Sequence, residues 1–216
     1  MTTFPVGSRI KHDGDLYAYE NTLAAQGFTT IAGVDEAGRG ACAGPLVAAA
    51  VVLRSPVPGL ADSKLLTPKA RDRAFEALQQ SDAVIEVISM SAADCDELGL
   101  HRANLTAMRR AIARLTPQPD YVLTDGYAVT GLTMESLAVW KGDRVSASIA
   151  AASVVAKVTR DRYMVQLHEQ YPNFGFDRHK GYVTKVHDAA LREFGPCPEH
   201  RMSYANVKQA LEVANT

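Results

Sequence analysis

Acidic side chains stand next to apolar, strand-like segments at three places in this chain of 216 residues: Asp35 with Glu36, Asp125, and Asp143. Strand ends that meet at one edge of a sheet would gather these carboxylates around one point. Like charges at short range raise each other's pKa unless cations neutralise them. Oxygen ligands alone select hard ions such as Mg²⁺ or Mn²⁺, and two such ions about 4 Å apart can promote phosphodiester hydrolysis. The four acids therefore predict a divalent-metal site for that chemistry.

Each acid also has an interpretation as an ordinary turn residue. Asp125 precedes a glycine and Asp143 follows one, and pairs of Asp and Gly are common in turns. Asp35 and Glu36 come directly after the apolar residues 31–34, where a plain turn is less typical. From the residues alone, both interpretations of the acids stay open.

A glycine-rich turn, Gly38–Pro45, follows the first two acids. Its glycine spacing is similar to a degenerate dinucleotide-binding loop, which would suggest a nucleotide-dependent oxidoreductase. Two acids directly before the glycines would repel a pyrophosphate, and Pro45 opposes a helix start in the register that such a loop needs. No suitable ribose-binding acid follows the next predicted strand. We therefore favour a tight turn beside the acids.

The segments that carry these residues alternate between strand-like and helix-like patterns. Short apolar runs predict strands at residues 31–34, 46–53, 83–90, 121–124 and 136–140. Capping residues and amphipathic spacing predict helices at residues 67–80, 101–115, 146–171, 184–194 and 204–213, with a short helical piece after Ser91. This alternation predicts an α/β fold whose mixed sheet is covered by helices.

The length suits a single domain that spans residues 1–216. Residues 1–28 mix charged, polar and glycine residues, and we expect them to form an N-terminal extension that packs loosely on the core. From about residue 184 to 216, the predicted helices form a helical C-terminal part. In the long helix, small side chains are expected to pack closely on the sheet, and Ser148 and Ser153 are expected to cap or pack.

The three cysteines, Cys42, Cys95 and Cys197, are odd in number and far apart, which indicates a reducing compartment rather than a disulfide framework. Cys197 and His200 form a C-x-x-H pair, but a second cysteine at metal-binding spacing is missing, so we expect no zinc site. The N-terminus lacks the apolar segment of a signal peptide, and no run approaches about 18 apolar residues. We therefore expect a cytoplasmic protein with no membrane partner, and a monomer by default.

The net charge of −1 argues against nucleic-acid binding through overall positive charge, but it permits a local basic face. Between Lys157 and Lys185, six Lys or Arg residues outnumber three acids. Lys64 and the basic residues of this stretch are candidates for phosphate contacts.

Eight segments, in this order and in combination, resemble the signature of the ribonuclease HII family over about residues 31–201: Ile31–Gly40, Ala43–Val52, Asp62–Thr67, Thr124–Gly126, Lys141–Asp143, Ser148–Asp161, His179–Thr184 and His200–Arg201. Their joint occurrence is highly specific, unlike any one segment alone. Two positions depart from the family pattern. Ala41-Cys42 stands where the family often has bulkier or proline-containing pairs, and Val183 stands where Gly or Pro usually follows the tyrosine.

The resemblance implies an RNase H-like fold, in which helices flank a five-stranded mixed sheet and a helical C-terminal part follows. It implies an endonuclease that cleaves the RNA strand of RNA–DNA hybrids and leaves a 3′-hydroxyl and a 5′-phosphate. It also implies incision on the 5′ side of single ribonucleotides embedded in duplex DNA. Its nucleic-acid partners would be RNA–DNA hybrids and ribonucleotide-containing duplex DNA, with ribonucleotide removal and RNA primer removal as its roles.

Carried over residue by residue, the resemblance assigns catalysis and the binding of Mn²⁺ or Mg²⁺ to four acids: Asp35, Glu36, Asp125 and Asp143. One ion would activate the attacking water, and the other would stabilise the leaving 3′-oxygen. All four acids are present, so we expect an active enzyme rather than the alternative, a catalytically silent nucleic-acid-binding module on the same fold.

The resemblance also implies two elements that select ribose. The turn Gly38-Arg39-Gly40 would contact the ribose 2′-hydroxyl mainly through backbone groups, and Tyr182 would stack on the sugar at the RNA–DNA junction. Only glycine lets a backbone approach a sugar so closely, and the 2′-hydroxyl is the group that distinguishes RNA from DNA at one position.

Overall fold

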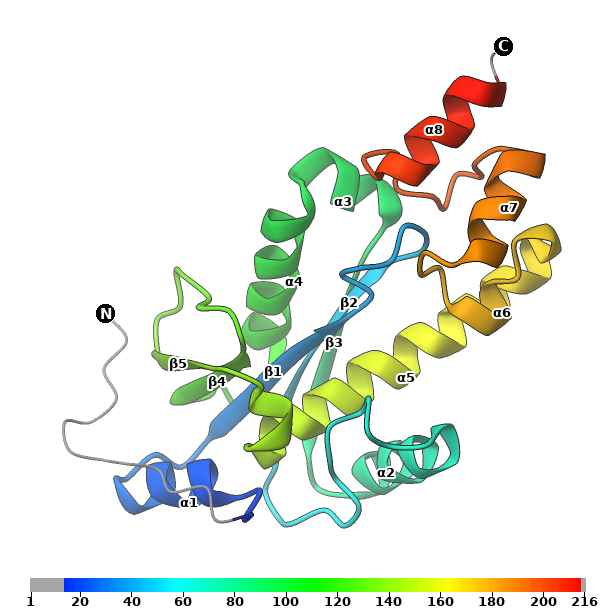
Figure 1. Cartoon of the computed structure of the whole chain (residues 1–216). Coiled ribbons are helices and arrows are strands. Elements are labelled where there is room, and N and C mark those ends of the chain that lie inside the picture. The colour runs from blue at the N-terminus through cyan, green and yellow to red at the C-terminus, as the bar shows by residue number, and fades with distance from the viewer. Residues whose placement is uncertain (1–13, 215–216) are drawn as a thin grey trace.

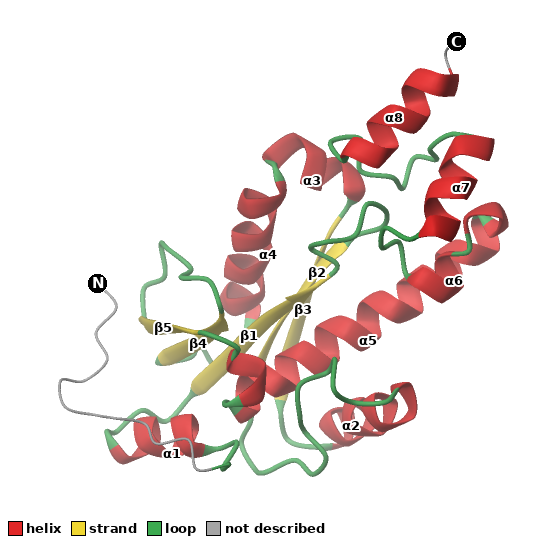
Figure 2. Ribbon diagram, viewed as in Figure 1, coloured by secondary structure: helices red, strands yellow, loops and turns green. Residues whose placement is uncertain are grey.

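The computed structural model describes residues 14–214, whose five strands form one sheet (Figures 1 and 2). The sheet order is β3-β2-β1-β4-β5. The central strand β1 is antiparallel to β2 and parallel to β4, so the sheet is mixed, as predicted. The strands are β1 (Ile31–Ala37), β2 (Leu46–Val52), β3 (Val84–Met90), β4 (Tyr121–Asp125) and β5 (Glu135–Val139). Because β1, β4 and β5 are parallel, their C-terminal ends meet at one edge of the sheet.

Helices begin where capping side chains predict them. Thr67, Ser91, Ser146 and Thr184 each accept a hydrogen bond from a backbone N–H of the helix that follows. Within the described residues, no helix is long and apolar enough to cross a membrane. The helices are α1 (Ala18–Ala25), α2 (Pro68–Gln80), α3 (Ala92–Leu98), α4 (Leu100–Arg114), α5 (Ala147–Gln170), α6 (Phe176–His179), α7 (Lys185–Phe194) and α8 (Ala205–Ala214).

Two helical layers cover the sheet, with α4 on one face and α5 and α2 on the other (Figure 2). The small residues of α5 pack closely on β1, as predicted. At Gly33 the contact leaves no space for a side chain, because an added Cβ would lie 2.0 Å from the backbone carbonyl carbon of Ser148. The position of α5 relative to β1 is therefore tightly fixed.

Strand β1 continues past the predicted end at residue 34. Asp35 pairs with Ala49 of β2, and Glu36 pairs with Ala48, so both acids lie inside the strand rather than after it. An apolar pattern cannot show this extension, because the two polar side chains belong to a site and not to the core. Their backbones are thus held by the sheet ladder instead of by a turn.

The segment between α5 and α7, for which the sequence predicted no helix, contains the short helix α6. Gly175 and Lys180 flank this single turn in left-handed backbone conformations. One helical turn is too short to show an amphipathic period. Helices α7 and α8 form the predicted helical C-terminal part, and α6 lies between them and the end of α5 (Figure 1).

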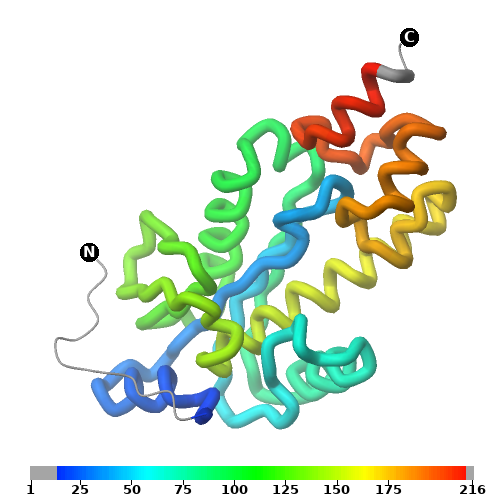
Figure 3. Tube along the Cα trace, viewed as in Figure 1, coloured from blue at the N-terminus to red at the C-terminus, as the bar shows by residue number. Residues whose placement is uncertain are grey.

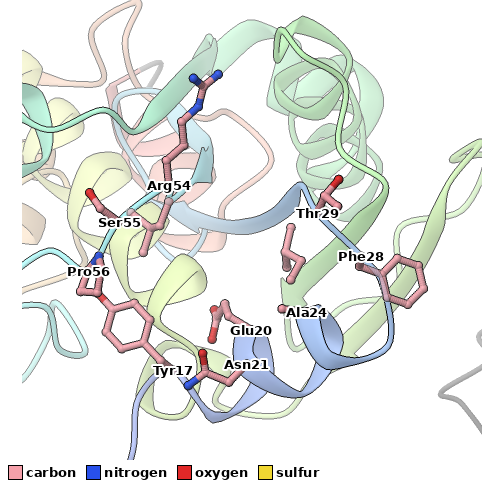
Figure 4. A pocket seen from close by; sticks show the side chains of 11 residues that line it. Tyr17, Glu20, Asn21, Ala24, Phe28, Thr29, Arg54, Ser55 and Pro56 are labelled. Carbon is pink, nitrogen blue, oxygen red and sulfur yellow. The ribbon is translucent and has the colours of Figure 1, made fainter.

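The N-terminal segment is anchored to the core from residue 14 onwards, so the expectation of loose packing is wrong for its described part. Leu23 of α1 is fully buried, and the Tyr17 hydroxyl accepts a hydrogen bond from the backbone N–H of Val57. Glu20 bonds to the start of α5. Figure 4 shows Tyr17 and Glu20 on one side of a cavity of about 250 Å³ that also reaches residues 54–56. This cavity contains none of the predicted site residues, and residues 1–13 lie outside the described part.

Candidate active site

Three of the four predicted acids meet at the edge where β1, β4 and β5 end. Carboxylate oxygens of Asp35, Asp125 and Asp143 all lie within 4.8 Å of one another. Asp35 lies in β1, Asp125 is the last residue of β4, and Asp143 lies in the 3₁₀ turn that follows β5. Asp125 also accepts a hydrogen bond of 2.7 Å from the backbone N–H of Gly142, which ties β4 to that turn. The three acids are thus placed by backbone elements.

Glu36 projects from the opposite face of β1, because neighbouring side chains alternate along a strand. Asp35 shares the α5 face with Gly33, whereas Glu36 turns towards Arg39 and the α4 residue Asn104. The Glu36 Oε2 atom is buried and has no hydrogen-bond partner among the described residues. The expectation that four carboxylates surround one point is therefore refined: three do, and Glu36 stands beside them.

Burial and mutual repulsion make Asp35, Glu36 and Asp143 reluctant to ionise. Burial, with the charges of Glu36 and Asp125, raises the pKa of Asp35 well above its usual range. Burial and the Asp125 charge raise the pKa of Glu36 to about 7, although Arg39 partly offsets this rise. The same two causes raise the pKa of Asp143. A bound cation would relieve both effects.

Lys64 forms an ion pair with this set. Its Nζ lies 3.3 Å from the Asp143 carboxylate, and its side chain is 69% exposed. Burial lowers the pKa of Lys64, but the charges of Asp35 and Asp143 outweigh burial and raise it overall. An ion pair this exposed contributes little to the stability of the fold. The main effect of Lys64 is therefore on the pKa of the acids beside it.

The glycine turn and the acids line the same cavity, whose volume is about 530 Å³. Gly38 has a φ of +87°, and an added Cβ would lie 1.9 Å from Arg160 Nε, so only glycine fits there. Gly40 is exposed, and an added Cβ would meet nothing nearer than Tyr182 Cε1 at 3.9 Å. The cavity is lined by Asp35, Glu36, Ala37, Gly38, Arg39, Gly40, Ser63, Lys64, Asp125, Ser153, Lys157 and Tyr182.

Tyr182 lines this cavity from a segment far along the chain. In Figure 3 the orange segment after α5 lies beside the blue turn after β1. It forms a β-bridge with Ala41, and the neighbouring Gly181 carbonyl accepts a hydrogen bond from the Cys42 backbone N–H. The Ala41-Cys42 departure thus lies at the junction between the turn and the Tyr182 segment. The Val183 side chain points away from the core and is 49% exposed.

Arg160 and Arg201 support the site from inside the protein. Arg160 is fully buried and donates hydrogen bonds to the carbonyl oxygens of Ala43, Pro45 and Lys180. Burial lowers its pKa to about 10. The prediction of a phosphate contact is therefore wrong for Arg160, because backbone carbonyls occupy its donors. Arg201, also buried, donates to carbonyls of the same glycine turn.

The cysteine and histidine side chains of the C-terminal part hydrogen-bond to one another. His187 Nε2 lies 3.0 Å from His200 Nε2, and Cys197 Sγ lies 3.2 Å from His200 Nδ1. Burial lowers the pKa of His187, and burial with the His187 charge lowers that of His200 to about 4. The His187 Nδ1 atom lies 3.0 Å from the Tyr182 carbonyl oxygen, so this buried pair supports the segment that carries Tyr182.

Ser63 and Trp140 line the candidate site although no role was predicted for them, whereas Ser153 was expected only to cap or pack and Lys157 was a candidate phosphate contact. The hydroxyls of Ser63 and Ser153 lie 2.6 Å apart at the cavity wall, and Lys157 Nζ lies 5.7 Å from the centre of the Tyr182 ring. Ser153 packs as predicted, but it also faces the cavity. Trp140 lines an adjacent cavity with Asp125 and Asp143. The only sequence signal for these residues was their place inside or beside the family-like segments.

The donor set fits a hard divalent cation. Three carboxylates converge, a fourth carboxylate has a buried oxygen without a partner, and every candidate ligand atom is oxygen. The cavity bordered by the glycine turn lies beside these acids. The sheet order and the acids at its edge define the class of protein: a hydrolase with a ribonuclease H-like fold.

Comparisons with known proteins identify the family. The family model described as ribonuclease HII matches residues 32–207. A ribonuclease HII from Salinispora tropica is 58% identical over 207 residues, which cover 94% of this chain and 77% of the relative. The crystal structure of ribonuclease H2 from Pyrococcus horikoshii has a TM-score of 0.72 and 26% identity, and covers 85% of this chain and 98% of that one. Bst-RNase HIII in complex with Mn²⁺ shares the fold, with a TM-score of 0.66, 21% identity, and coverage of 89% and 73%.

The chain therefore belongs to the ribonuclease HII family. It is a ribonuclease H, a nuclease of the hydrolase class. The five-stranded mixed sheet predicted from the sequence is confirmed by both the structure and these relatives.

Proposed function

We propose that the chain is an endonuclease that hydrolyses the RNA strand of RNA–DNA hybrids and incises on the 5′ side of single ribonucleotides in duplex DNA. Its products would carry a 3′-hydroxyl and a 5′-phosphate. The observation that carries the proposal is the shared cavity, in which a glycine turn borders the acids that fit divalent cations. The biological roles that follow are ribonucleotide repair in DNA and RNA primer removal.

Asp35, Glu36, Asp125 and Asp143 would hold two divalent ions, Mn²⁺ or Mg²⁺. When bound, the ions would supply an activated water and charge stabilisation for the leaving 3′-oxygen. The acids' own part is to fix the ligand oxygens at the sheet edge, for which Glu36 must first release its proton. Lys64, beside Asp143, would contact the phosphate that is cut.

The ribose would be selected at the turn and at Tyr182. The backbone groups of Gly38-Arg39-Gly40 would bond the 2′-hydroxyl, for which the exposed Gly40 leaves room. The Tyr182 ring would pack on the next sugar, where it would detect the absence of a 2′-hydroxyl. Lys157 and Arg160, at 5.7 and 5.3 Å from the ring centre, favour one position of that ring.

We further propose that residues 1–216 act as one catalytic domain, as a monomer in the cytoplasm. Tyr17 and Glu20 support the single domain, because they join the N-terminal helix to the loop after β2 and to α5. The monomer remains a default expectation that analytical ultracentrifugation tests.

The direct test is cleavage of a duplex with one embedded ribonucleotide, and of a full RNA–DNA hybrid, with Mg²⁺ or Mn²⁺. We expect incision by the wild type and a loss on the order of 100-fold or more for Asp35→Asn. Failure of the wild type to cut would reject the nuclease, and binding without cutting would favour a silent nucleic-acid-binding module. Equal cutting by Asp35→Asn would reject the assigned acid.

Tyr182 needs a test of its own, because its role is to sense the junction. Tyr182→Ala should lose activity on the single-ribonucleotide duplex more than on the long hybrid, and Tyr182→Phe should retain most of it. Unchanged activity of Tyr182→Ala on the single ribonucleotide would remove the sensing role.

A further inference from the structure

Trp140 is the only tryptophan of the chain, and its side chain is 80% exposed. A large aromatic side chain gains stability by burial, so such exposure contributes nothing to this fold. Neighbouring Val139 at the end of β5 is buried, as alternation along a strand requires. The indole therefore points outward at the edge of the sheet where Asp125 and Asp143 lie.

The indole borders a cavity of about 360 Å³ that adjoins the one containing Tyr182. Asp125 and Lys64 line both cavities. Tyr182 lines only the first cavity and Trp140 only the second, so the two aromatic residues lie on different sides of Asp125 and Lys64. This second cavity is lined by Asp62, Lys64, Asp125, Gly126, Tyr127, Trp140, Lys141, Asp143 and Arg144. It therefore continues the candidate active site beyond the acids, on the side away from the glycine turn.

The backbone on which Trp140 stands is fixed. Lys141 adopts a left-handed conformation with a φ of +53°, and the N–H of Gly142 is bonded to Asp125. Gly142 is buried, and an added Cβ would lie 2.5 Å from a methyl group of Ile149. The exposed indole is thus held on a rigid base rather than on a free loop, which lowers the entropy cost of using it for binding.

We propose that Trp140 is a substrate-binding residue that packs against a base or sugar of the nucleic-acid duplex on the side of the acids opposite Tyr182. Lys64, Lys141 and Arg144 line the cavity around it, and with bound cations offsetting the acids Asp62, Asp125 and Asp143 they suit a polyanion. A protein partner docked on the same indole would cover Asp125 and Asp143, so the geometry favours the substrate. This inference rests on the proposed function, because it extends the same binding surface.

Because Trp140 is the only tryptophan, the intrinsic tryptophan fluorescence of the protein reports on this site alone. The wild-type protein in EDTA is titrated with a fluorophore-labelled RNA–DNA hybrid, and binding is followed by anisotropy of the label. The same titration with unlabelled hybrid follows the tryptophan emission. We expect both signals to saturate at the same concentration. Binding seen by anisotropy with no change in tryptophan emission would overturn the inference.

Kinetics supply the second measurement. Trp140→Ala should raise KM by about 5- to 150-fold, the effect of one lost aromatic contact to a base, and leave kcat within about twofold. Trp140→Phe should restore most of the affinity, which a merely structural role would not require. Phe194→Ala, which removes an exposed aromatic outside both cavities, is the matched control and should bind hybrid as the wild type does.

The two proposals fail in different ways. A wild-type protein that neither binds nor cuts hybrid would reject the nuclease itself. A wild type that cuts hybrid, together with a Trp140→Ala variant whose KM is unchanged, would reject only the role of Trp140.

Discussion

The carboxylate of Glu20 accepts hydrogen bonds of 2.9 Å and 2.6 Å from the backbone N–H and the hydroxyl of Ser148. The same Glu20 oxygen accepts a bond of 2.6 Å from the hydroxyl of Ser146, the N-cap of α5. A carboxylate at a helix N-terminus is favoured by the unpaired N–H groups and by the helix dipole. Glu20 of the N-terminal helix thereby supplies an acceptor for the donors at the start of α5, directly after the turn that carries Asp143.

Glu20→Ala should lower the free energy of unfolding by about 1–3 kcal/mol, because it removes a charged acceptor from three donors. Activity should fall as well, because the turn with Asp143 loses its support. Urea unfolding and hybrid cleavage measure the two effects. Glu20→Gln keeps an acceptor oxygen and should recover most of the stability; a Glu20→Ala protein as stable as the wild type would contradict this role.

Asp125→Asn and Asp143→Asn should leave the fold intact and lower cleavage on the order of 100-fold or more, since each removes one charge from the converging set. In Asp125→Asn the side-chain amide oxygen can still accept the hydrogen bond from the Gly142 N–H, so unfolding should change little for that variant. Cleavage rates and calorimetric titration with Mn²⁺ are the measurements. Glu76→Gln, an exposed acid on α2, is the control and should match the wild type.

Lys64→Ala should shift the acidic limb of the pH–activity profile to higher pH. The Lys64 charge lowers the pKa of both Asp35 and Asp143, so its loss raises both values further. Lys69→Ala, which removes an exposed lysine from the first turn of α2, should leave the profile in place. An acidic limb that stays put in Lys64→Ala would show that the lysine has no electrostatic effect on these acids.

Metal affinity should rise with pH up to about pH 7. The pKa of Glu36, raised from 4.5 to about 7, means that Glu36 still carries a proton at pH 6 in the protein without metal. A cation must displace that proton, so affinity should fall by up to about tenfold for each unit below pH 7. The raised pKa also means that the metal-free fold loses stability as the pH rises from 4.5 towards 7, because Glu36 gives up its proton more readily in the unfolded chain. Calorimetric titrations with Mg²⁺ between pH 6 and 8 test this, and an affinity that is flat over the range would contradict it.

Gly33→Ala should lower the stability of the fold, whereas Gly40→Ala should weaken recognition of the hybrid. At Gly33 the new methyl group would lie 2.0 Å from the backbone of α5, so we expect a loss of about 1–3 kcal/mol or more in urea unfolding. Gly40 has room for the same methyl group, so its unfolding should change little. Gly40→Ala should instead weaken binding of hybrid, because the methyl group enters the opening proposed for the ribose. Equal hybrid affinity in Gly40→Ala and the wild type would remove the turn from recognition.

Much of the fold was predictable because its signals are local. Thr67, Ser91, Ser146 and Thr184 mark helix starts through bonds to their own following turns, and the apolar run at β2 is short enough to indicate a buried strand. The acids were predictable for a similar reason, since each stands beside such a strand. Their assignment to one site rested on the ordered family-like segments. The spacing of the acids alone could not supply that assignment.

Several features that the sequence did not indicate depend on partners elsewhere in the chain. Asp35 and Glu36 are strand residues because β2 pairs with them. Arg160 resembles a surface cation until the carbonyls of residues 43–45 are seen around it. Glu20 looks like one more charge in a polar extension, and only the start of α5 gives it a role. No local pattern contains such information.

The supports of the glycine turn have a consequence for how the protein is made. Asp35, Glu36, Asp125 and Asp143 all precede residue 144, whereas Arg160, Tyr182 and Arg201, which brace or face the turn, come later. A ribosome delivers the chain from its N-terminus, so the acids emerge before the braces do. A nascent chain would thus carry all four acids and the glycine turn before it carries the residues that hold the turn in place.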